Sequence, residues 1–149
     1  MTVGEFCNRE VVVAERETTI VDAAKLMRQY HVGDLVVVDR SSAMTIPVGV
    51  ITDRDIVVEI IAREVSLDAA CAGDIMSHSL ITAGVQDGIL DTLQKMRAKG
   101  IRRLPVVNDE GGLEGILAID DVLELLSEEL SLLAKAAIRG QEQEMKLRP

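Results

Sequence analysis

The residues best suited to chemistry in this sequence follow directly on a short apolar segment. Thr52, Arg54 and Asp55 come after the apolar run 49–51 and bring a hydroxyl, a guanidinium and a carboxylate within four positions. A carboxylate can accept two hydrogen bonds from a vicinal diol, and a helix beginning at Thr52 would offer unpaired N–H groups to a phosphate. The same spacing is typical of a capping box, in which Thr52 and Asp55 satisfy each other's backbone N–H groups. Both interpretations stay open, because a carboxylate turned onto its own helix is not free for a ligand.

The other reactive residue types are isolated along the chain. His31 and His78 have no partner at metal-ligand spacing, and Cys7 and Cys71 form neither a disulfide framework nor a metal motif. The sequence contains no Ser-His-Asp or Cys-His arrangement, no P-loop and no glycine-rich dinucleotide motif. We therefore expect a protein without catalytic residues, without a metal site and without a required cofactor.

The composition excludes several classes of partner. Of the 149 residues 48% are hydrophobic but only 1% are aromatic, which argues against base stacking and sugar binding. The formal net charge of −9 makes a nucleic acid an unfavourable partner. No apolar run reaches the roughly 18 residues that a membrane span needs, and the N-terminus lacks the basic start and apolar segment of a signal peptide. We expect a cytoplasmic protein with no membrane segment.

The sequence repeats itself once. A shift of 69 residues places 20–39 over 89–108, and seven of these twenty positions are identical. After the next loop the shift becomes 66, so that Gly49 corresponds to Gly115 and Asp55 to Asp121. Because an internal repeat decides the architecture, the chain is best understood as two copies of one unit.

Each copy contains the same predicted elements in the order β-α-β-β-α. The predicted strands are 11–13, 35–38 and 48–51 in the first copy, and 80–82, 104–107 and 113–117 in the second. Helical spacing of apolar residues begins at Ile20 and at Ile89, and a second helix begins near Thr52 and near Asp120. One copy alone would leave a face of its three-stranded sheet uncovered. We therefore predict an α/β (α+β) fold with two repeats packed sheet to sheet about a local two-fold axis.

The polar residues at the candidate site differ between the copies. Ala118 stands where the first copy has Thr52, although Asp121 is retained. Arg102 and Arg103 precede the middle strand of the second copy, where the first copy has a glycine and an aspartate. The hydroxyl and one carboxylate thus come from the first copy and two arginines from the second. The alternative for the arginines is a solvated surface or ion pairs with nearby acids.

The repeat resembles a CBS domain, the module named after cystathionine β-synthase, and the chain resembles a tandem pair of them, also called a Bateman module. The matching motifs are DIMS at Asp74, the central segments LMRQYHVGDLVVVD and KMRAKGIRRLPVVND, and the endings GVITDRD and GILAIDD. The resemblance covers residues 4–126 and is strongest to small stand-alone bacterial CBS-pair proteins. We expect a first repeat over 1–65, a linker over 66–73, a second repeat over 74–126 and a C-terminal helix extension and tail over 127–149.

The resemblance implies a regulatory or sensing function. Many CBS pairs bind an adenosine-containing ligand (AMP, ADP, ATP, S-adenosylmethionine or NAD) in clefts between the repeats and signal to a partner protein. They commonly form homodimers shaped as discs of four repeats. The alternative is a ligand-free, dimeric interaction or scaffold protein.

The resemblance also implies roles for individual residues. Thr52 corresponds to a residue near a ligand phosphate, and Asp55 to one that takes the ribose hydroxyls. Basic residues at the positions of Arg102 and Arg103 often face phosphates in the family. The remaining candidate ligand-binding residues are Arg54 beside Asp55, Asp121 as its counterpart, and Val13 and Thr82 at the ends of the first strands.

The last helical pattern continues beyond the second repeat. Its apolar residues Val122, Leu126, Leu130, Leu133 and Ala137 follow a period of 3.6 residues. This stripe is longer than one small sheet can cover, which favours an oligomer contact or a partner-binding helix over a helix folded back on its own module. After Gly140 we expect a frayed polar tail.

Overall fold

The computed structural model describes residues 1–40 and 43–148. Ser41 and Ser42, in the predicted loop between the second and third strands, and Pro149, in the predicted tail, lie outside the described residues. The chain divides into two compact units, residues 1–117 and residues 118–149, and each is described by itself.

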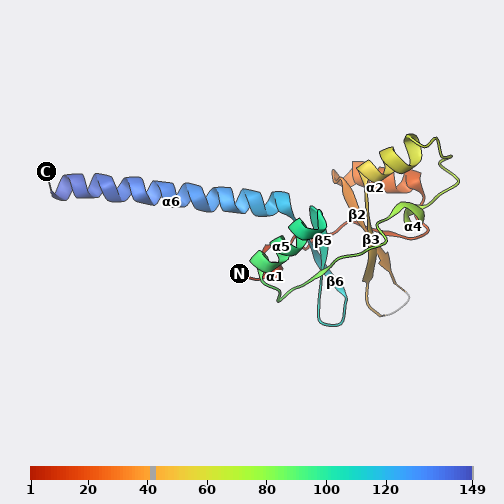
Figure 1. Ribbon diagram of the computed structural model, residues 1–149, viewed down its shortest axis with the longest axis horizontal. Coiled ribbons are helices and arrows are strands. Elements are labelled where there is room, and N and C mark those ends of the chain that lie inside the picture. The colour runs from red at the N-terminus through yellow and green to blue at the C-terminus, as the bar shows by residue number, and fades with distance from the viewer. Residues whose placement is uncertain (41–42, 149) are drawn as a thin grey trace. The chain divides into compact units, whose positions relative to one another are not determined.

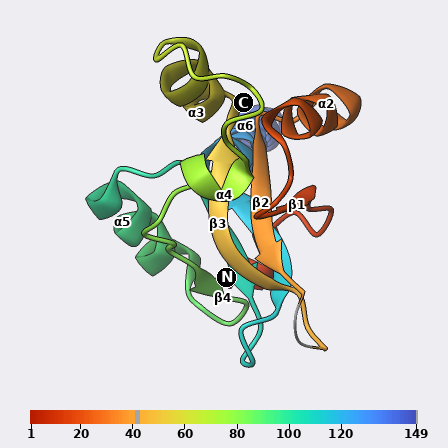
Figure 2. The same ribbon diagram turned by 90° about the vertical axis from the view of Figure 1, so that its right-hand side faces the viewer.

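Residues 1–118 provide two three-stranded sheets, one from each repeat (Figures 1 and 2). The first sheet has the order β1-β2-β3, with β1 parallel and β3 antiparallel to the central β2. The second has the order β4-β5-β6, with β4 parallel to β5. The strands are β1 (Val13–Glu15), β2 (Asp34–Asp39), β3 (Ile46–Thr52), β4 (Ala83–Gly84), β5 (Arg103–Val107) and β6 (Leu113–Ala118).

In the part of the chain that the structure describes, seven helical segments accompany the sheets. They are α1 (Val3–Phe6), α2 (Ile20–Tyr30), α3 (Asp53–Asp55), the π-helical turn η1 (Ile56–Ile61), α4 (Ala72–Ile75), α5 (Ile89–Lys99) and α6 (Ile119–Leu147). The two repeats and the long C-terminal helix predicted from the sequence are confirmed. Within residues 1–40 and 43–148, no helix combines the length and apolar character that a membrane crossing demands.

The long helix of each repeat buries the same positions against its sheet. In α2 these are Ile20, Ala23 and Met27, and in α5 they are the residues 69 positions later, Ile89, Thr92 and Met96. Both helices end in the left-handed conformation, at His31 with φ 54° and at Gly100 with φ 65°. The two methionines are therefore core residues.

The central strand of the first sheet is buried on both faces. Leu35 and Val37 belong to the core cluster beneath α2, whereas Val36 and Val38 point to the opposite face and are also buried. A strand covered on both sides carries an unbroken apolar run, which explains why Leu35–Val38 lacks alternation. This burial is the signature of sheet-to-sheet packing.

The segment that precedes the first repeat is hydrogen-bonded to the second repeat. The Val3 N–H donates to the Asp87 carbonyl oxygen at 2.8 Å. Asn8 and Ile116 exchange two backbone hydrogen bonds, each 2.9 Å long. The N-terminal residues therefore fold as part of the second repeat, although they lie in the sequence before the first.

The segment that precedes the second repeat crosses in the reverse direction. The Ala72 N–H donates to the Thr18 carbonyl oxygen at 2.8 Å, and the Ser77 N–H donates to the Val50 carbonyl oxygen at 3.0 Å. Helix α4 thereby lies against β1 and β3 (Figure 2). The two repeats exchange their leading segments, and each segment is hydrogen-bonded to the third strand of the other repeat's sheet.

A glycine stands at each crossing. A Cβ on Gly115 would lie 2.7 Å from both the Asn8 carbonyl oxygen and the Cys7 Sγ atom, which is closer than real Cβ contacts allow. A Cβ on Gly49, the equivalent residue, would lie 2.5 Å from the Sδ atom of Met76. Met76 is in turn the residue 69 positions after Cys7. The glycines shared by both repeats are therefore required by the close approach of the exchanged segments.

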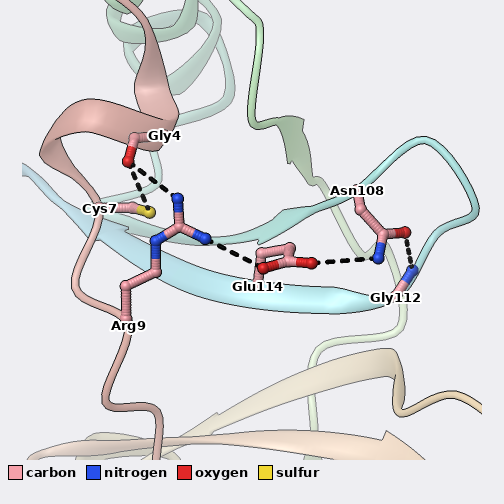
Figure 3. Close-up of polar contacts among 6 residues, drawn as sticks. All are labelled: Gly4, Cys7, Arg9, Asn108, Gly112 and Glu114. Carbon is pink, nitrogen blue, oxygen red and sulfur yellow. Dashed lines mark hydrogen bonds and ion pairs between the residues drawn. The ribbon is translucent and has the colours of Figure 1, made fainter.

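Side chains reinforce the N-terminal crossing (Figure 3). The Arg9 guanidinium forms a 3.0 Å ion pair with Glu114 on β6 and donates to the Gly4 carbonyl oxygen at 3.2 Å. The Asn108 amide donates to the other Glu114 oxygen at 3.2 Å and accepts from the Gly112 N–H at 2.9 Å. Because Arg9 and Glu114 are partly exposed, this network fixes the position of the segment more than it adds stability.

The predicted first strands are displaced by two to three residues. The structure has β1 at Val13–Glu15 and β4 at Ala83–Gly84 in place of 11–13 and 80–82. The apolar residues Val11 and Ile81 line clefts, so their character reflects packing and not strand pairing. The short helices α1 and α4 had no detectable period and were not predicted.

The frayed tail predicted after Gly140 is wrong, because helix α6 runs through Gly140 to Leu147. One glycine in a helix interior costs only about 1 kcal/mol relative to alanine, and the surrounding Gln, Glu, Met and Lys residues have high helix propensity. The helix predicted to begin near Thr52 begins at Asp53, and α3 continues directly into η1.

We predict that Gly115→Ala lowers the free energy of unfolding by about 1–3 kcal/mol, because the added methyl group must displace the Asn8 backbone. Gly88→Ala is the matched control, since the nearest atom to its Cβ would be 3.6 Å away. Urea unfolding of both variants measures the difference. Equal losses would show that the crossing tolerates a side chain.

Candidate functional site

A cleft of about 470 Å³ opens in residues 1–117 beside the end of β3 and the start of β5. It is lined by Thr52, Arg54 and Asp55 from the first repeat and by Arg102 and Arg103 from the second. These are five of the eight residues predicted from the sequence. The polar groups that each repeat holds only in part therefore meet in one cleft.

The rest of the cleft wall is largely apolar and comes mainly from the second repeat. The apolar lining residues are Val50, Leu80, Ile81, Ile101 and Pro105. These residues were not predicted as site residues. The sequence provides no signal for Leu80 and Ile81, because their apolar run predicts a strand, and only the structure places them before β4.

Two serines place this apolar wall beside β3. Ser77 and Ser79 also line the cleft. Ser77 accepts a hydrogen bond from the Val50 N–H on its Oγ atom at 3.1 Å, in addition to its backbone bond to Val50. The exchange of leading segments thus brings residues 77–81 next to Thr52 and creates one side of the cleft.

Thr52 and Asp55 form a complete capping box at the start of α3. The Asp55 N–H donates to the Thr52 Oγ1 atom at 3.1 Å, and the Thr52 N–H donates to the Asp55 Oδ2 atom at 2.8 Å. Both side chains are half-buried. The structure therefore has the Asp55 carboxylate on its own helix and, at the same time, at the edge of the cleft.

The helix that these residues cap offers little to an anion. The first N–H groups of this helix already have acceptors within the chain. The Asp53 N–H donates to the Gly33 carbonyl oxygen at 2.9 Å, and the Arg54 N–H donates to the Asp53 carboxylate at 2.8 Å. Positive charge in the cleft comes instead from the three arginine side chains.

Arg103 makes an ion pair that joins the repeats. Its Nε atom lies 3.1 Å from the Asp34 Oδ1 atom, and the Asp34 side chain is only 12% exposed. Asp34 and Arg103 occupy equivalent positions, 69 residues apart, in the two copies. The predicted alternative of ion pairing is thus realised for Arg103, and its guanidinium is held at the cleft by a carboxylate of the other repeat.

A second capping box of the same kind lies outside the cleft. The Cys71 N–H donates to the Asp74 Oδ2 atom at 2.9 Å, and the Cys71 thiol donates to it at 3.3 Å. The backbone hydrogen bond from Cys71 lowers the pKa of Asp74, and the side-chain hydrogen bond to Asp74 raises the pKa of the Cys71 thiol. Cys71 and Asp74 thus make the same kind of helix cap as Thr52 and Asp55, but they do not line the cleft.

The three other predicted site residues lie elsewhere. Val13 lines a different cleft of about 560 Å³, with Glu10 and Tyr30 among its other lining residues. Thr82 is not among the cleft-lining residues, and its carbonyl oxygen accepts a 2.9 Å hydrogen bond from Lys95. Asp121 lies in the first turn of α6, in the unit formed by residues 118–149.

The second cleft is the repeat-related counterpart of the first. Five of its lining residues stand 69 positions before Ser77, Ser79, Leu80, Ile81 and Ile101 of the first cleft; they are Asn8, Glu10, Val11, Val12 and Val32. At the positions of Arg102 and Arg103 the first copy has Gly33 and Asp34. The cationic character of the first cleft is therefore not repeated in the second. Among the residues the structure describes, no group of His, Cys, Asp and Glu side chains could hold a metal ion.

The chain was compared with known protein families, curated proteins and solved structures. The family model described as CBS domain matches twice, over residues 3–62 and 72–128. An uncharacterized protein of Methanopyrus kandleri, MK0525, is 35% identical over 84% of this chain and 62% of its own length. The mitochondrial CBS domain-containing protein CBSX3 of Arabidopsis thaliana is 36% identical over 76% of this chain and 55% of its own length. The chain thus spans less than two thirds of these relatives.

A solved structure with the same fold contains bound ligands. The CBS domain pair of protein MJ0100, in complex with 5′-methylthioadenosine and S-adenosyl-L-methionine, superimposes with a TM-score of 0.72. It is 25% identical and covers 85% of this chain and 99% of that one. With two matches to the family model and the same paired sheets, the chain belongs to the CBS-domain family and contains two CBS domains in tandem.

Proposed function

We propose that this chain is a regulatory module that binds an adenosine-containing ligand with an anionic group in the cleft beside Thr52. The observation that supports it is the meeting of Thr52, Asp55, Arg102 and Arg103 in one cleft, although no single repeat carries all four. Binding changes the contact between the repeats, and a partner protein responds to that change.

The parts of the cleft suit the parts of such a ligand. The apolar side chains of Leu80, Ile81 and Pro105 provide a surface for the flat face of adenine. The Asp55 carboxylate accepts hydrogen bonds from the ribose diol. Arg102 and Arg103 pair with the anionic group, and the volume of about 470 Å³ lies in the usual range for small-molecule sites.

The relatives support the ligand class. Protein MJ0100 was solved with two adenosine-containing molecules, 5′-methylthioadenosine and S-adenosyl-L-methionine. AMP, ADP, ATP and NAD contain the same adenosine moiety and add phosphates. A homodimer in the form of a disc and a cytoplasmic location stay predictions from the family resemblance, as do the roles of Val13, Thr82 and Asp121.

The second candidate function is a ligand-free interaction or scaffold protein. Two observations favour it: the Asp55 carboxylate is bound to the Thr52 N–H, and the second copy lacks the hydroxyl at Ala118. The two candidates differ in a direct measurement, because a scaffold gives no heat with any adenosine-containing compound.

We predict that calorimetric titration with AMP, ADP, ATP, S-adenosylmethionine and NADH detects binding of at least one compound. Asp55→Asn should weaken that binding by roughly 10- to 100-fold, because it removes the charge from an acceptor of the ribose hydroxyls. Absence of heat from all five compounds at millimolar concentration would favour the scaffold.

The matched control for this substitution is Asp74→Asn. Asp74 closes the same kind of capping box but lies outside the cleft. Both substitutions should reduce stability by a similar, small amount. If Asp74→Asn weakened binding as much as Asp55→Asn, the loss of affinity in Asp55→Asn would come from a less stable fold and not from a lost contact between Asp55 and the ligand.

We further predict that Asp34→Asn strengthens the binding of phosphorylated ligands several-fold and leaves adenosine binding unchanged. The Asp34 carboxylate competes with a phosphate for Arg103, and its removal also lowers the negative charge at the cleft. Titration of AMP and adenosine against both proteins measures the difference.

Glu114→Gln is the control for Asp34→Asn. It removes a carboxylate from the Arg9 ion pair, which lies outside the cleft, and should change neither affinity. A loss of AMP affinity in Asp34→Asn would contradict competition and assign Asp34 the opposite role of orienting Arg103.

A further inference from the structure

Helix α6 exposes far more apolar surface than a free helix tolerates. Every residue from 126 to 148 is exposed to solvent (Figure 1, blue). Within residues 126–148 the large apolar side chains are between 45% exposed, at Leu126, and 74% exposed, at Leu147. Most helices in proteins are stabilised by packing of an apolar face, and contiguous apolar surface of this kind marks an interaction site. The helix therefore requires a partner.

One set of α6 residues forms a seam with a heptad spacing, while the exposed Leu132, Ile138 and Met145 lie outside it. Alternating steps of three and four residues join Leu123, Leu126, Leu130, Leu133, Ala137 and Gly140, and the seam reaches Leu147 one heptad further on. Only Glu144 interrupts it. A seam of this spacing is typical of a two-helix coiled coil, so the occupant is expected to be another helix.

The two halves of the seam differ in side-chain size. The first half consists of leucines at 123, 126, 130 and 133, whereas the second half passes through Ala137 and Gly140. A Cβ on Gly140 would meet no atom within 4 Å, so nothing within the described chain explains a glycine there. Small residues on a seam allow a large side chain of the opposite helix to approach.

The two halves of the helix also differ in charge. Residues 119–133 contain five acidic residues and no basic one, whereas residues 134–148 contain four basic residues and two acidic ones. The helix dipole favours acids only within the first turn, so it does not account for Glu124, Glu128 and Glu129. Two parallel copies would place ten acidic residues together, but two antiparallel copies place each acidic half beside a basic half.

We propose that α6 pairs antiparallel with α6 of a second copy of this chain. Size and charge both select this orientation. In the register that aligns the seams, Leu130 faces Gly140 of the second copy, Leu133 faces Ala137, and Leu126 faces Glu144 near the end of the pair. The starts of the two helices then lie roughly 48 Å apart, since each residue adds about 1.5 Å.

Disulfide trapping tests the orientation. Two variants of the full chain, Leu126→Cys and Glu144→Cys, each carry Cys7→Ser and Cys71→Ser and differ in mass through a tag. After mixing and mild oxidation, the antiparallel pair gives the mixed 126–144 disulfide in at least tenfold excess over either homodisulfide. A dominant 126–126 product would overturn the proposal in favour of a parallel pair, and no product above the level of Leu90→Cys would overturn pairing through α6.

Solution mass provides a second test that does not depend on oxidation. Leu130→Glu introduces a charge at the centre of the seam and is expected to halve the mass found by light scattering. Leu90→Glu is the matched control, because Leu90 on α5 is similarly exposed, at 70% against 67%, but lies outside the seam. An unchanged mass in Leu130→Glu, with the urea midpoint of both variants intact, would overturn the proposal.

Discussion

The exchange of leading segments between the two repeats is the interaction on which the rest of the structure depends. Each sheet has its third strand crossed by a segment that belongs, in sequence, to the other repeat, and the crossings are close enough to require Gly49 and Gly115. The backbone bond between Ser77 and Val50 is part of this exchange, and it carries residues 77–81 to the side of Thr52. The cleft therefore exists because the repeats are interlocked. A change in how closely they approach would alter the cleft, which is the property a sensing module needs.

The local two-fold relation between the repeats makes two clefts, but the side chains make them different. Arg103 and Asp34 stand at equivalent positions of the two repeats and form an ion pair with each other. In two identical repeats these positions would carry the same residue and therefore two like charges. An arginine at each of the two positions would give two positive charges that repel across the interface, and an aspartate at each would give two negative charges that repel. The divergence of the repeats thus stabilises their contact and concentrates positive charge in one cleft. This physical reason favours one anion site over two.

Much of this arrangement could be predicted from the sequence, because the signals were local or repeated. The periods of 20–30 and 89–99 define α2 and α5, and the shift of 69 residues predicts their equivalence. The exchange of segments could not be predicted, since α1 and α4 have four residues each and show no period. Leu80 and Ile81 were assigned to a strand because an apolar run cannot tell a cleft wall from a sheet. A single glycine predicts a frayed tail after Gly140, but the helix-forming residues around it keep α6 helical to Leu147.

The capping box and the proposed ligand contact at Asp55 are compatible. From the sequence they are alternatives, because a carboxylate turned onto its own helix is not free for a ligand. The structure shows that the cap uses the Oδ2 atom for one hydrogen bond at 2.8 Å, whereas an ionised carboxylate has about four acceptor positions. The cap also holds the Asp55 side chain in one conformation at the cleft edge. A ligand that binds there does not have to order this side chain, which saves part of the entropy cost of binding. The cap therefore prepares the proposed site, in which the two residues that begin the helix are also the proposed ligand contacts.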